Sequence, residues 1–101
     1  MIIRTWHGRT TLADANAYKT FMKERAAPDY GSVKGLKQLF FTRRDEGEIA
    51  HFLLITVWDN MDAVKAFAGD DPERAKYYPE DDQYLLEKED CSLNHRVFFE
   101  G

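Results

Sequence analysis

The chain has 101 residues, of which 44% are hydrophobic and 14% aromatic, which is enough to build one core. Its 14 basic and 18 acidic residues give a formal charge of −4, and this acidic balance argues against nucleic-acid binding. No apolar run approaches the roughly 20 residues of a membrane helix, and the first ten residues lack a signal-peptide pattern. We therefore expect a cytoplasmic protein with one domain over residues 1–101 and no membrane partner.

The first part of the chain predicts a strand followed by a helix. Residues 2–9 are rich in β-branched and aromatic side chains, which favour a strand. Thr11 and Asp14 have the spacing of a capping box, with Asp in place of Glu. A helical stripe follows at Tyr18, Phe21, Met22, Arg25 and Ala26. We expect this helix to stop before Pro28, because the residue preceding a proline disfavours the α conformation, and residues 28–35 to form a loop.

The middle of the chain predicts a hairpin. Residues 36–44 form the second predicted strand, and Gly47 lies at the tip of the turn, where a positive φ is needed. Residues 49–58, IAHFLLITVW, are almost continuously apolar, which is typical of a strand buried on both faces. One face can pack on the helices of the same chain. The other face needs a second cover, and the chain has little left to supply it.

The last third predicts a second helix, a cover and a final strand. Asp59 or Asn60 is expected to cap the helix, and Gly69 to end it. Its predicted buried stripe consists of Met61, Val64, Phe67 and Ala68. A further turn is predicted over residues 72–77, a short helix or irregular cover over residues 81–87, and a strand over residues 93–99, LNHRVFF.

The order β-α-β-β-α-β predicts an α+β fold, the ferredoxin-like split fold with an antiparallel sheet. Two helices would then cover one face of the sheet. The opposite face is still apolar, so we expect it to meet its copy in a homodimer closed sheet against sheet.

The stretch FLLITVWDNMDAVKAFAG resembles the antibiotic biosynthesis monooxygenase (ABM) family of the dimeric α+β barrel superfamily. The opening IIRTWHGRT, the stretch YYPEDDQYLLEKE and the closing NHRVFF look like an uncharacterised branch of it. The resemblance covers nearly the whole chain. It implies the fold, the homodimer and a pocket between sheet and helices for a small aromatic ligand.

Two branches of that family differ in cofactor. Haem-degrading members carry a Trp on the second helix, a haem-ligating His after it and an Asn on the first strand. Phe67 and Tyr77 stand at the two later positions here, and the first strand offers Thr5 or His7 but no Asn. We therefore expect no haem, no other cofactor and no metal.

The second branch oxidises aromatic polyketides without metal or flavin, by deprotonating a phenol in a dry pocket. Two functions remain open on this resemblance. The chain is either a small cofactor-independent monooxygenase acting on a phenolic or quinone-like compound, or a non-catalytic ligand-binding or stress-linked protein. An enzyme should have a closed cavity with at least two convergent polar groups. A structural module would fill that space with side chains.

The candidate catalytic residues are His7 and Tyr77. A histidine can accept or donate a proton near neutral pH. His7 alternates onto one face with Ile3 and Thr5, although a hydrogen-bonded core His fits the same pattern. The candidate substrate-binding residues are Trp58, Tyr78 and His95. Their alternatives are a helix anchor, a packed aromatic and a dimer-interface His. If residues 72–77 are helical, only one of the two adjacent tyrosines faces inward.

The remaining features predict no chemistry. His51 is expected at a rim, and Cys91, the only cysteine, as a small buried side chain. The acidic residues after Pro79 lack the spacing of a calcium loop and are expected to be a solvated flank. No glycine-rich nucleotide loop occurs.

Overall fold

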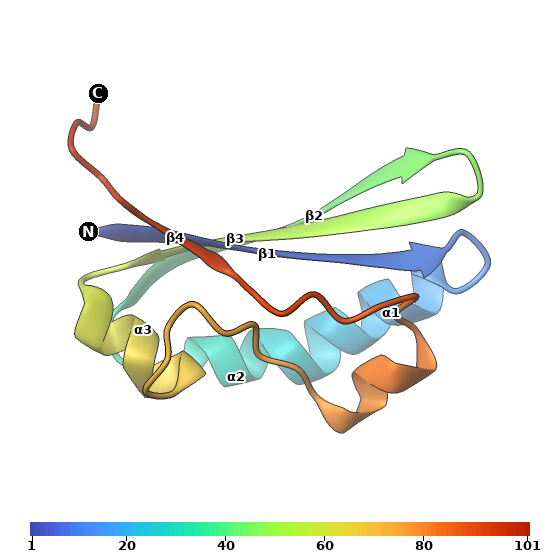
Figure 1. The fold of residues 1–101 in the computed structure, drawn as a ribbon, viewed down its shortest axis with the longest axis horizontal. Helices are drawn as coiled ribbons and strands as arrows, with labels where there is room; N and C mark the ends of the chain where they lie inside the picture. The colour runs from blue at the N-terminus through green and yellow to red at the C-terminus, as the bar shows by residue number, and fades with distance from the viewer.

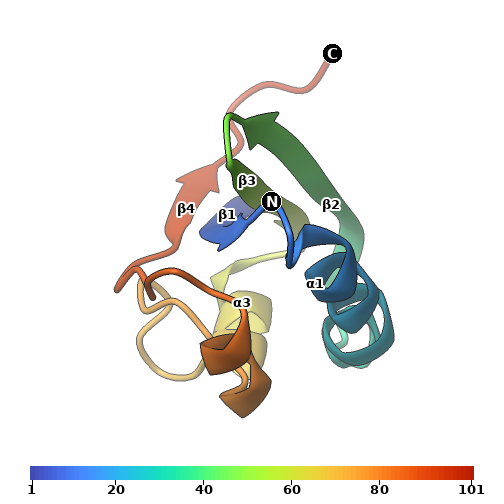
Figure 2. The same cartoon turned by 90° about the vertical axis from the view of Figure 1, so that its right-hand side faces the viewer.

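The fold was taken from a computed structural model that describes all 101 residues. One antiparallel sheet has the strand order β2-β3-β1-β4, and the helices lie on one of its faces (Figures 1 and 2). The strands are β1 (Ile2–Thr11), β2 (Leu36–Glu46), β3 (Ile49–Trp58) and β4 (Leu93–Arg96). The helices are α1 (Ala15–Phe21), a π-helix (Met22–Ala26), α2 (Ala27–Gly31), α3 (Met61–Ala68) and a 3-10 helix (Pro79–Gln83). The predicted ferredoxin-like α+β fold is confirmed.

Strand alternation divides the sheet into an inner face and an outer face. The long β1–β3 pairing runs from Ile2 opposite Trp58 to Thr11 opposite Ile49. Along β1 every second residue from Ile2 onwards is buried against the helices, and the residues between are half-buried on the outer face. No helix covers the outer face in Figure 2. The period of two thus sets which candidate residues can reach the space between sheet and helices.

The first helix does not stop before Pro28, and this prediction is wrong. Ala27 is α-helical (φ −57°, ψ −45°), and its N–H donates to Met22 O across a π turn. Pro28 therefore falls in the first turn of α2, where a missing N–H costs little. Tyr30, predicted to lie in a loop, is 5% exposed and stacks on Phe67 at 4.2 Å between ring centroids. Burial of this ring outweighs the local preference of the residue before proline.

The π turn also has a packing consequence. Four buried residues recur at a spacing of four: Tyr18, Met22, Ala26 and Tyr30. Such a spacing drifts around an α-helix of about 3.6 residues per turn. A wider π turn offsets the drift and keeps all four side chains against the sheet.

The hairpin and α3 follow their local signals. Gly47 has φ 58° in the β2–β3 turn, and Gly69 has φ 96° where α3 ends. Asn60, one of the two predicted caps, accepts a hydrogen bond from Ala63 N at 2.9 Å. Val64 and Phe67 of the predicted stripe are buried.

The segment after α3 forms no helix over residues 72–77, which corrects that prediction. The buried Arg4 guanidinium donates to Pro72 O at 2.6 Å and to Arg74 O at 3.0 Å. A helix would need such carbonyl groups for its own hydrogen bonds. Arg74 instead forms an isolated bridge with Cys91, which is exposed rather than buried as predicted because this bridge lies outside the core.

The last strand is shorter than predicted. β4 pairs with β1 only opposite Ile2 to Thr5, and Val97 N donates to Met1 O. Beyond that point β1 offers no further partner, so the end of the chain leaves the sheet (Figure 1). Phe98 and Phe99 are 96% and 80% exposed. None of the helices is long and apolar enough to cross a membrane.

Candidate functional site

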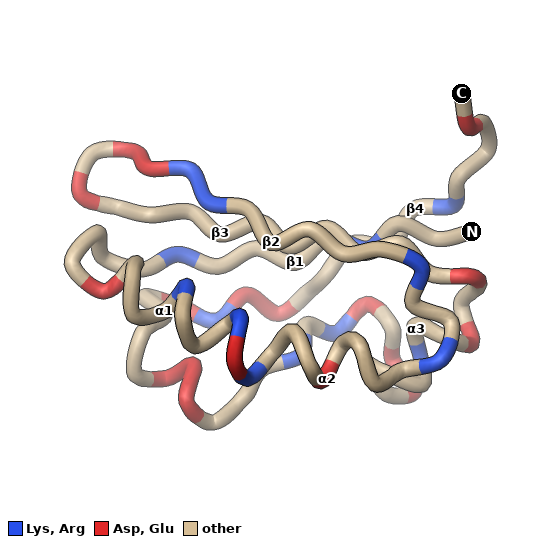
Figure 3. The backbone as a smooth tube through the Cα atoms, turned by 180° about the vertical axis from the view of Figure 1, so that it is seen from behind, with Lys and Arg blue, Asp and Glu red and all other residues tan.

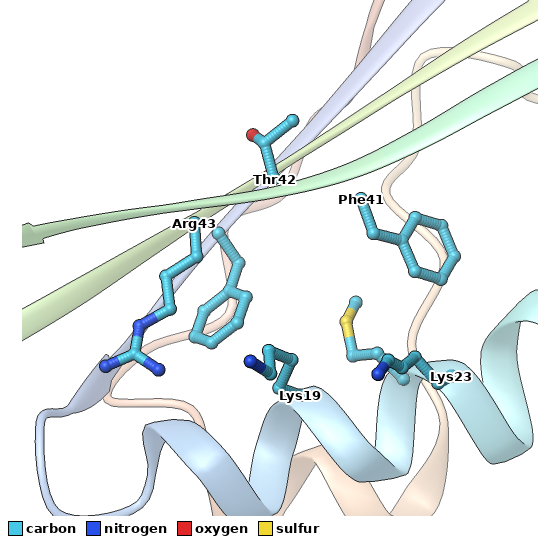
Figure 4. A pocket seen from close by; sticks show the side chains of 7 residues that line it. Lys19, Lys23, Phe41, Thr42 and Arg43 are labelled. Carbon is cyan, nitrogen blue, oxygen red and sulfur yellow. The ribbon is translucent and has the colours of Figure 1, made fainter.

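A cavity of about 180 Å³ lies between the first helix and the inner face of β2 and β3. We call it the cationic pocket. Its apolar walls are Met22, Phe41 and Phe52, and its basic side chains are Lys19, Lys23 and Arg43. In Figure 4 the two lysines extend from the helix on the side of Phe41 and Arg43, whereas Thr42 points to the other side of the strand.

The charge of the cationic pocket is only partly neutralised within the chain. Arg43 binds Asp45 at 2.8 Å and Asn16 at 2.9 Å. Lys19 and Lys23 lie four residues apart, one helical turn, and neither pairs with a carboxylate. Figure 3 shows basic positions recurring along the helix beneath β2. In a chain of net charge −4, this pocket is a local site of attraction for an anion.

The pocket has the size of a single aromatic ring. A cavity of about 150 Å³ lined by apolar side chains holds benzene. Phe52 is 3% exposed and Met22 is 4% exposed, so the floor is dry and rigid except for the flexible thioether. None of these three basic residues was predicted from the sequence as a site residue. The sequence did contain a signal for this pocket. Lys19 and Lys23 are spaced one helical turn apart, and Arg43 lies on the strand that faces them.

A second cavity, the inner cavity, lies between the helices, β1 and the segment after α3. Its volume is only about 10 Å³. Side chains fill this space: Trp6, Tyr18, Phe21, Met22, Ala26, Tyr30, Leu54, Lys76, Tyr78 and Asp81 line it. The closed cavity expected of an enzyme is therefore not preformed here. The position implied by the family resemblance is occupied mainly by aromatic rings.

Asp81 is the one acidic residue after Pro79 that is buried, which corrects the expectation of a wholly solvated flank. It is 2% exposed and accepts hydrogen bonds from Tyr18 Oη at 2.8 Å and from Tyr78 N at 2.7 Å. Burial raises the pKa of Asp81, and these two hydrogen bonds oppose that rise. The Asp81 carboxylate caps the first turn of the 3-10 helix, and this role turns the Asp81 side chain inward.

Tyr78 lines the inner cavity and also closes it from the outside. Its hydroxyl donates to Asp29 Oδ2 at 2.5 Å, and Arg25 Cζ lies 4.5 Å from its ring centroid. Lys76 Nζ binds the same Asp29 oxygen at 3.1 Å. Burial tends to raise the pKa of Asp29, but the hydrogen bonds from Tyr78 and Lys76 together with nearby cations hold it below its ordinary value.

His7 and Tyr77 meet at Glu89, outside the cationic pocket and the inner cavity. Tyr77 and Glu89 line a separate, more open cavity of about 370 Å³. Tyr77 Oη donates to Glu89 O at 2.6 Å, and His7 Nδ1 lies 2.5 Å from Glu89 Oε2. Burial raises the pKa of Tyr77 to about 12, with a smaller contribution from the Glu89 charge. His7 Nε2 lies 3.0 Å from His51 Nδ1, so both nitrogens of His7 already have partners on the outer face.

The other two candidates lie apart from both cavities. Trp58 is fully buried in the core, and its indole N–H donates to Thr56 Oγ1 at 2.8 Å. His95 is exposed on β4, opposite Ile3 and on the outer face. Of the sequence-predicted site residues, only Tyr78 lines one of these two cavities.

The fold and this layered site define a class, the small ferredoxin-like α+β proteins with one antiparallel sheet. No family model matches the chain, and no curated protein matches it. Among solved structures, one similar chain is a MhuD point mutant, described as having two manganese protoporphyrin IX molecules bound per active site. The TM-score is 0.62 at 16% sequence identity, over 100% of this chain and 98% of the MhuD chain. This likeness establishes the fold.

The residues present do not fit a porphyrin. A macrocycle of four pyrrole rings needs several times the volume of one ring. The cationic pocket, the inner cavity and the open cavity beside Tyr77 measure about 180, 10 and 370 Å³. None of the three histidines lines any of these cavities. Phe67 has no atom that could ligate iron and is packed in the core, and the Tyr77 hydroxyl already donates to the Glu89 carbonyl group.

Proposed function

We propose that this protein binds a small aromatic anion, with a single ring, in the cationic pocket. The observation that carries this proposal is the pair of unpaired lysines, Lys19 and Lys23, above an apolar floor in a cavity of about 180 Å³. The ring would lie on Phe41 and Phe52, and its phenolate or carboxylate would face the lysines. Apolar walls with a few convergent charges are typical of small-molecule sites.

Oxygenation of a bound phenol without cofactor is the second candidate function. Two ammonium groups favour the phenolate, which is the form that donates an electron to O₂. Conversion of a phenol by one O₂ into a quinone and one water balances without an external reductant. The ABM-type fold and the lysines support this reaction, whereas a general base inside the pocket is lacking among its lining residues. Ligand binding is therefore the function that the geometry supports best.

The binding proposal can be tested with 4-nitrophenol, whose phenolate has its own absorbance. Binding next to Lys19 and Lys23 should increase the phenolate fraction at a fixed pH near the pKa of the free compound. The double variant Lys19→Ala/Lys23→Ala should lose about tenfold or more in affinity, the effect of about 1.4 kcal/mol. Lys65→Ala, an exposed lysine on α3, is the matched control. Equal affinity in all three proteins would refute the proposal.

The two candidate functions separate in the same experiment. An oxygen electrode and the quinone absorbance report turnover of a 1-naphthol probe to 1,4-naphthoquinone and water, and binding without oxygen uptake leaves a ligand-binding protein. Haemin is the negative control, and it should not bind stoichiometrically. A one-to-one haemin complex with a shifted Soret band would contradict the size argument.

We further propose that the outer face closes a homodimer. It exposes Phe40, Leu53 and Leu93, which are 48%, 38% and 59% exposed. Half-buried Ile3, Ile55 and Val57 lie between them on neighbouring strands. Apolar side chains gathered on one part of a sheet face in this way are typical of a protein interface.

A further inference from the structure

One buried polar group in the inner cavity has no hydrogen-bond partner. Trp6 is 5% exposed, lines this cavity and carries its indole N–H on Nε1 without an acceptor in the chain. A buried donor without an acceptor is costly, so such groups commonly face a ligand or a water. Trp58, the other tryptophan, shows the usual arrangement, because its N–H donates to Thr56.

Met22 forms a wall shared by the cationic pocket and the inner cavity. A methionine has three rotatable bonds and adapts its shape readily, so it is a wall that can move. The backbone at this position is also unusual, because the π-helix begins at Met22. Such π turns within α-helices are often found at functional sites.

We propose that the ligand of the cationic pocket extends past Met22 and that Trp6 Nε1 donates a hydrogen bond to an oxygen at its far end. The ligand class is then an aromatic anion with a second, uncharged oxygen acceptor opposite its anionic group, such as an aryl ketone or quinone-like carbonyl. The anion is held by Lys19 and Lys23, and Trp6 determines specificity. This inference deepens the proposed function and rests on it.

The inner cavity suits one acceptor atom. Its volume of about 10 Å³ is close to that of a single small polar group. The other polar groups that line it are already engaged: Asp81 accepts from Tyr18, and the Tyr78 hydroxyl donates to Asp29. Among the residues that line this cavity, Trp6 thus carries the donor without a partner. A carbonyl oxygen would satisfy it, whereas a methyl group of the same size would leave it unpaired.

Three probes separate the two proposals: benzoate, 4-acetylbenzoate and 4-isopropylbenzoate. Benzoate tests the cationic pocket alone. The acetyl and isopropyl probes have similar shapes and differ in the acceptor oxygen. The acetyl probe should bind about tenfold more tightly than the isopropyl probe, the scale of one hydrogen bond. The Trp6→Phe variant should bind benzoate normally and lose this preference.

NMR gives a readout that does not depend on the variant folding. The unmodified protein has two indole N–H signals, from Trp6 and Trp58. Titration with 4-acetylbenzoate should move the Trp6 signal downfield and leave that of Trp58 in place. 4-Isopropylbenzoate should cause a smaller change at Trp6. The ring of Tyr77 lies edge-to-face with Trp6 at 5.8 Å, so a ring-face acceptor for this N–H is the competing explanation.

The outcomes are distinct. Binding of benzoate with equal affinities for the other two probes, or with a Trp6 signal that stays in place, overturns this inference and leaves the proposed function standing. Failure of all three probes to bind overturns both proposals. A tenfold preference that disappears in Trp6→Phe, together with the Trp6 shift, supports both.

Discussion

His7 Nε2 lies 3.0 Å from His51 Nδ1, and each imidazole has a carboxylate at its other nitrogen. Glu89 lies 2.5 Å from His7 Nδ1, and Glu46 lies 3.2 Å from His51 Nε2. Three protons on the four ring nitrogens satisfy all three contacts, because each carboxylate needs an N–H and the central contact needs one proton. This line of four residues links β1, β2, β3 and the segment after the 3-10 helix across the outer face.

The Glu46 end of this line predicts a pH-dependent stability. The hydrogen bond with His51, followed by the Arg44 charge, lowers the pKa of Glu46. An acid with a lowered pKa in the folded state adds stability above its unfolded pKa, and this stability is lost as the pH falls through the folded value. Glu46→Gln should therefore lower the urea midpoint at pH 7, and the difference should vanish at low pH.

The control for this experiment is Glu48→Gln in the same exposed turn, whose side chain has no ion pair. Because Glu46 is a solvent-exposed side chain, the effect should be small. A Glu46→Gln effect that is the same at low and neutral pH, or that is matched by Glu48→Gln, would show that the contact with His51 does not stabilise the fold.

The stability that Asp81 contributes should depend on pH with the opposite sign to that of Glu46. Its pKa is raised mainly by burial. A carboxyl group with a raised folded pKa contributes most stability below its unfolded pKa, and this contribution is lost as the pH rises through the folded value. Asp81→Asn should therefore cost more stability at acidic pH than at pH 7. Denaturation across this range is the measurement, with the exposed Asp82→Asn as control. A cost that grows with pH would contradict burial as the dominant cause.

The sequence predicted those parts of the fold that local chemistry decides. The boundaries of β3 at residues 49–58 followed from a continuous apolar run with turn residues on either side. The ends of α3 followed from Asn60 and Gly69, since one supplies a cap and the other a positive φ. Hydrophobic periods of two and of 3.6 residues were enough to predict the order of the strands and helices.

Contacts between distant segments decided what the sequence did not predict. The helix continues through Pro28 because Tyr30 packs on Phe67, 37 positions later in the chain. Asp81 is buried because Tyr18 offers it a hydroxyl group. In the candidate site, alternation along β1 grouped His7 with Ile3 and Thr5 as observed, but this is the outer face and not the face of the two cavities. The partners of His7, Glu89 and His51, come from other elements. No spacing along the chain encodes these pairings.

The homodimer makes a direct prediction about mass. Sedimentation at micromolar concentration should give about twice 11.8 kDa. Leu53→Glu places a charge beside Ile55 in the apolar part of the outer face and should yield a folded monomer, because an unpaired charge is costly to bury in an interface. Lys65→Glu, on an exposed position of α3, is the matched control. A wild-type protein that remains a monomer with an intact fold would disprove the dimer.

Substitutions at Phe67 and Tyr77 should differ in how much folding stability they cost. These two residues stand at the positions where haem-degrading proteins carry a Trp and a His. Phe67 is 6% exposed and stacks on Tyr30 at 4.2 Å, so Phe67→Ala should cost about 3–5 kcal/mol of unfolding free energy. Tyr77→Phe removes one hydrogen bond to Glu89 O and keeps the ring against Trp6, so its cost should stay within about 1.5 kcal/mol. Urea denaturation of both variants measures these values.

Tyr77→Phe should also leave 4-nitrophenol affinity unchanged, because Tyr77 does not line the cationic pocket. A harmless Phe67→Ala would overturn its place in the core, and a loss of 4-nitrophenol binding in Tyr77→Phe would move the ligand site towards Glu89.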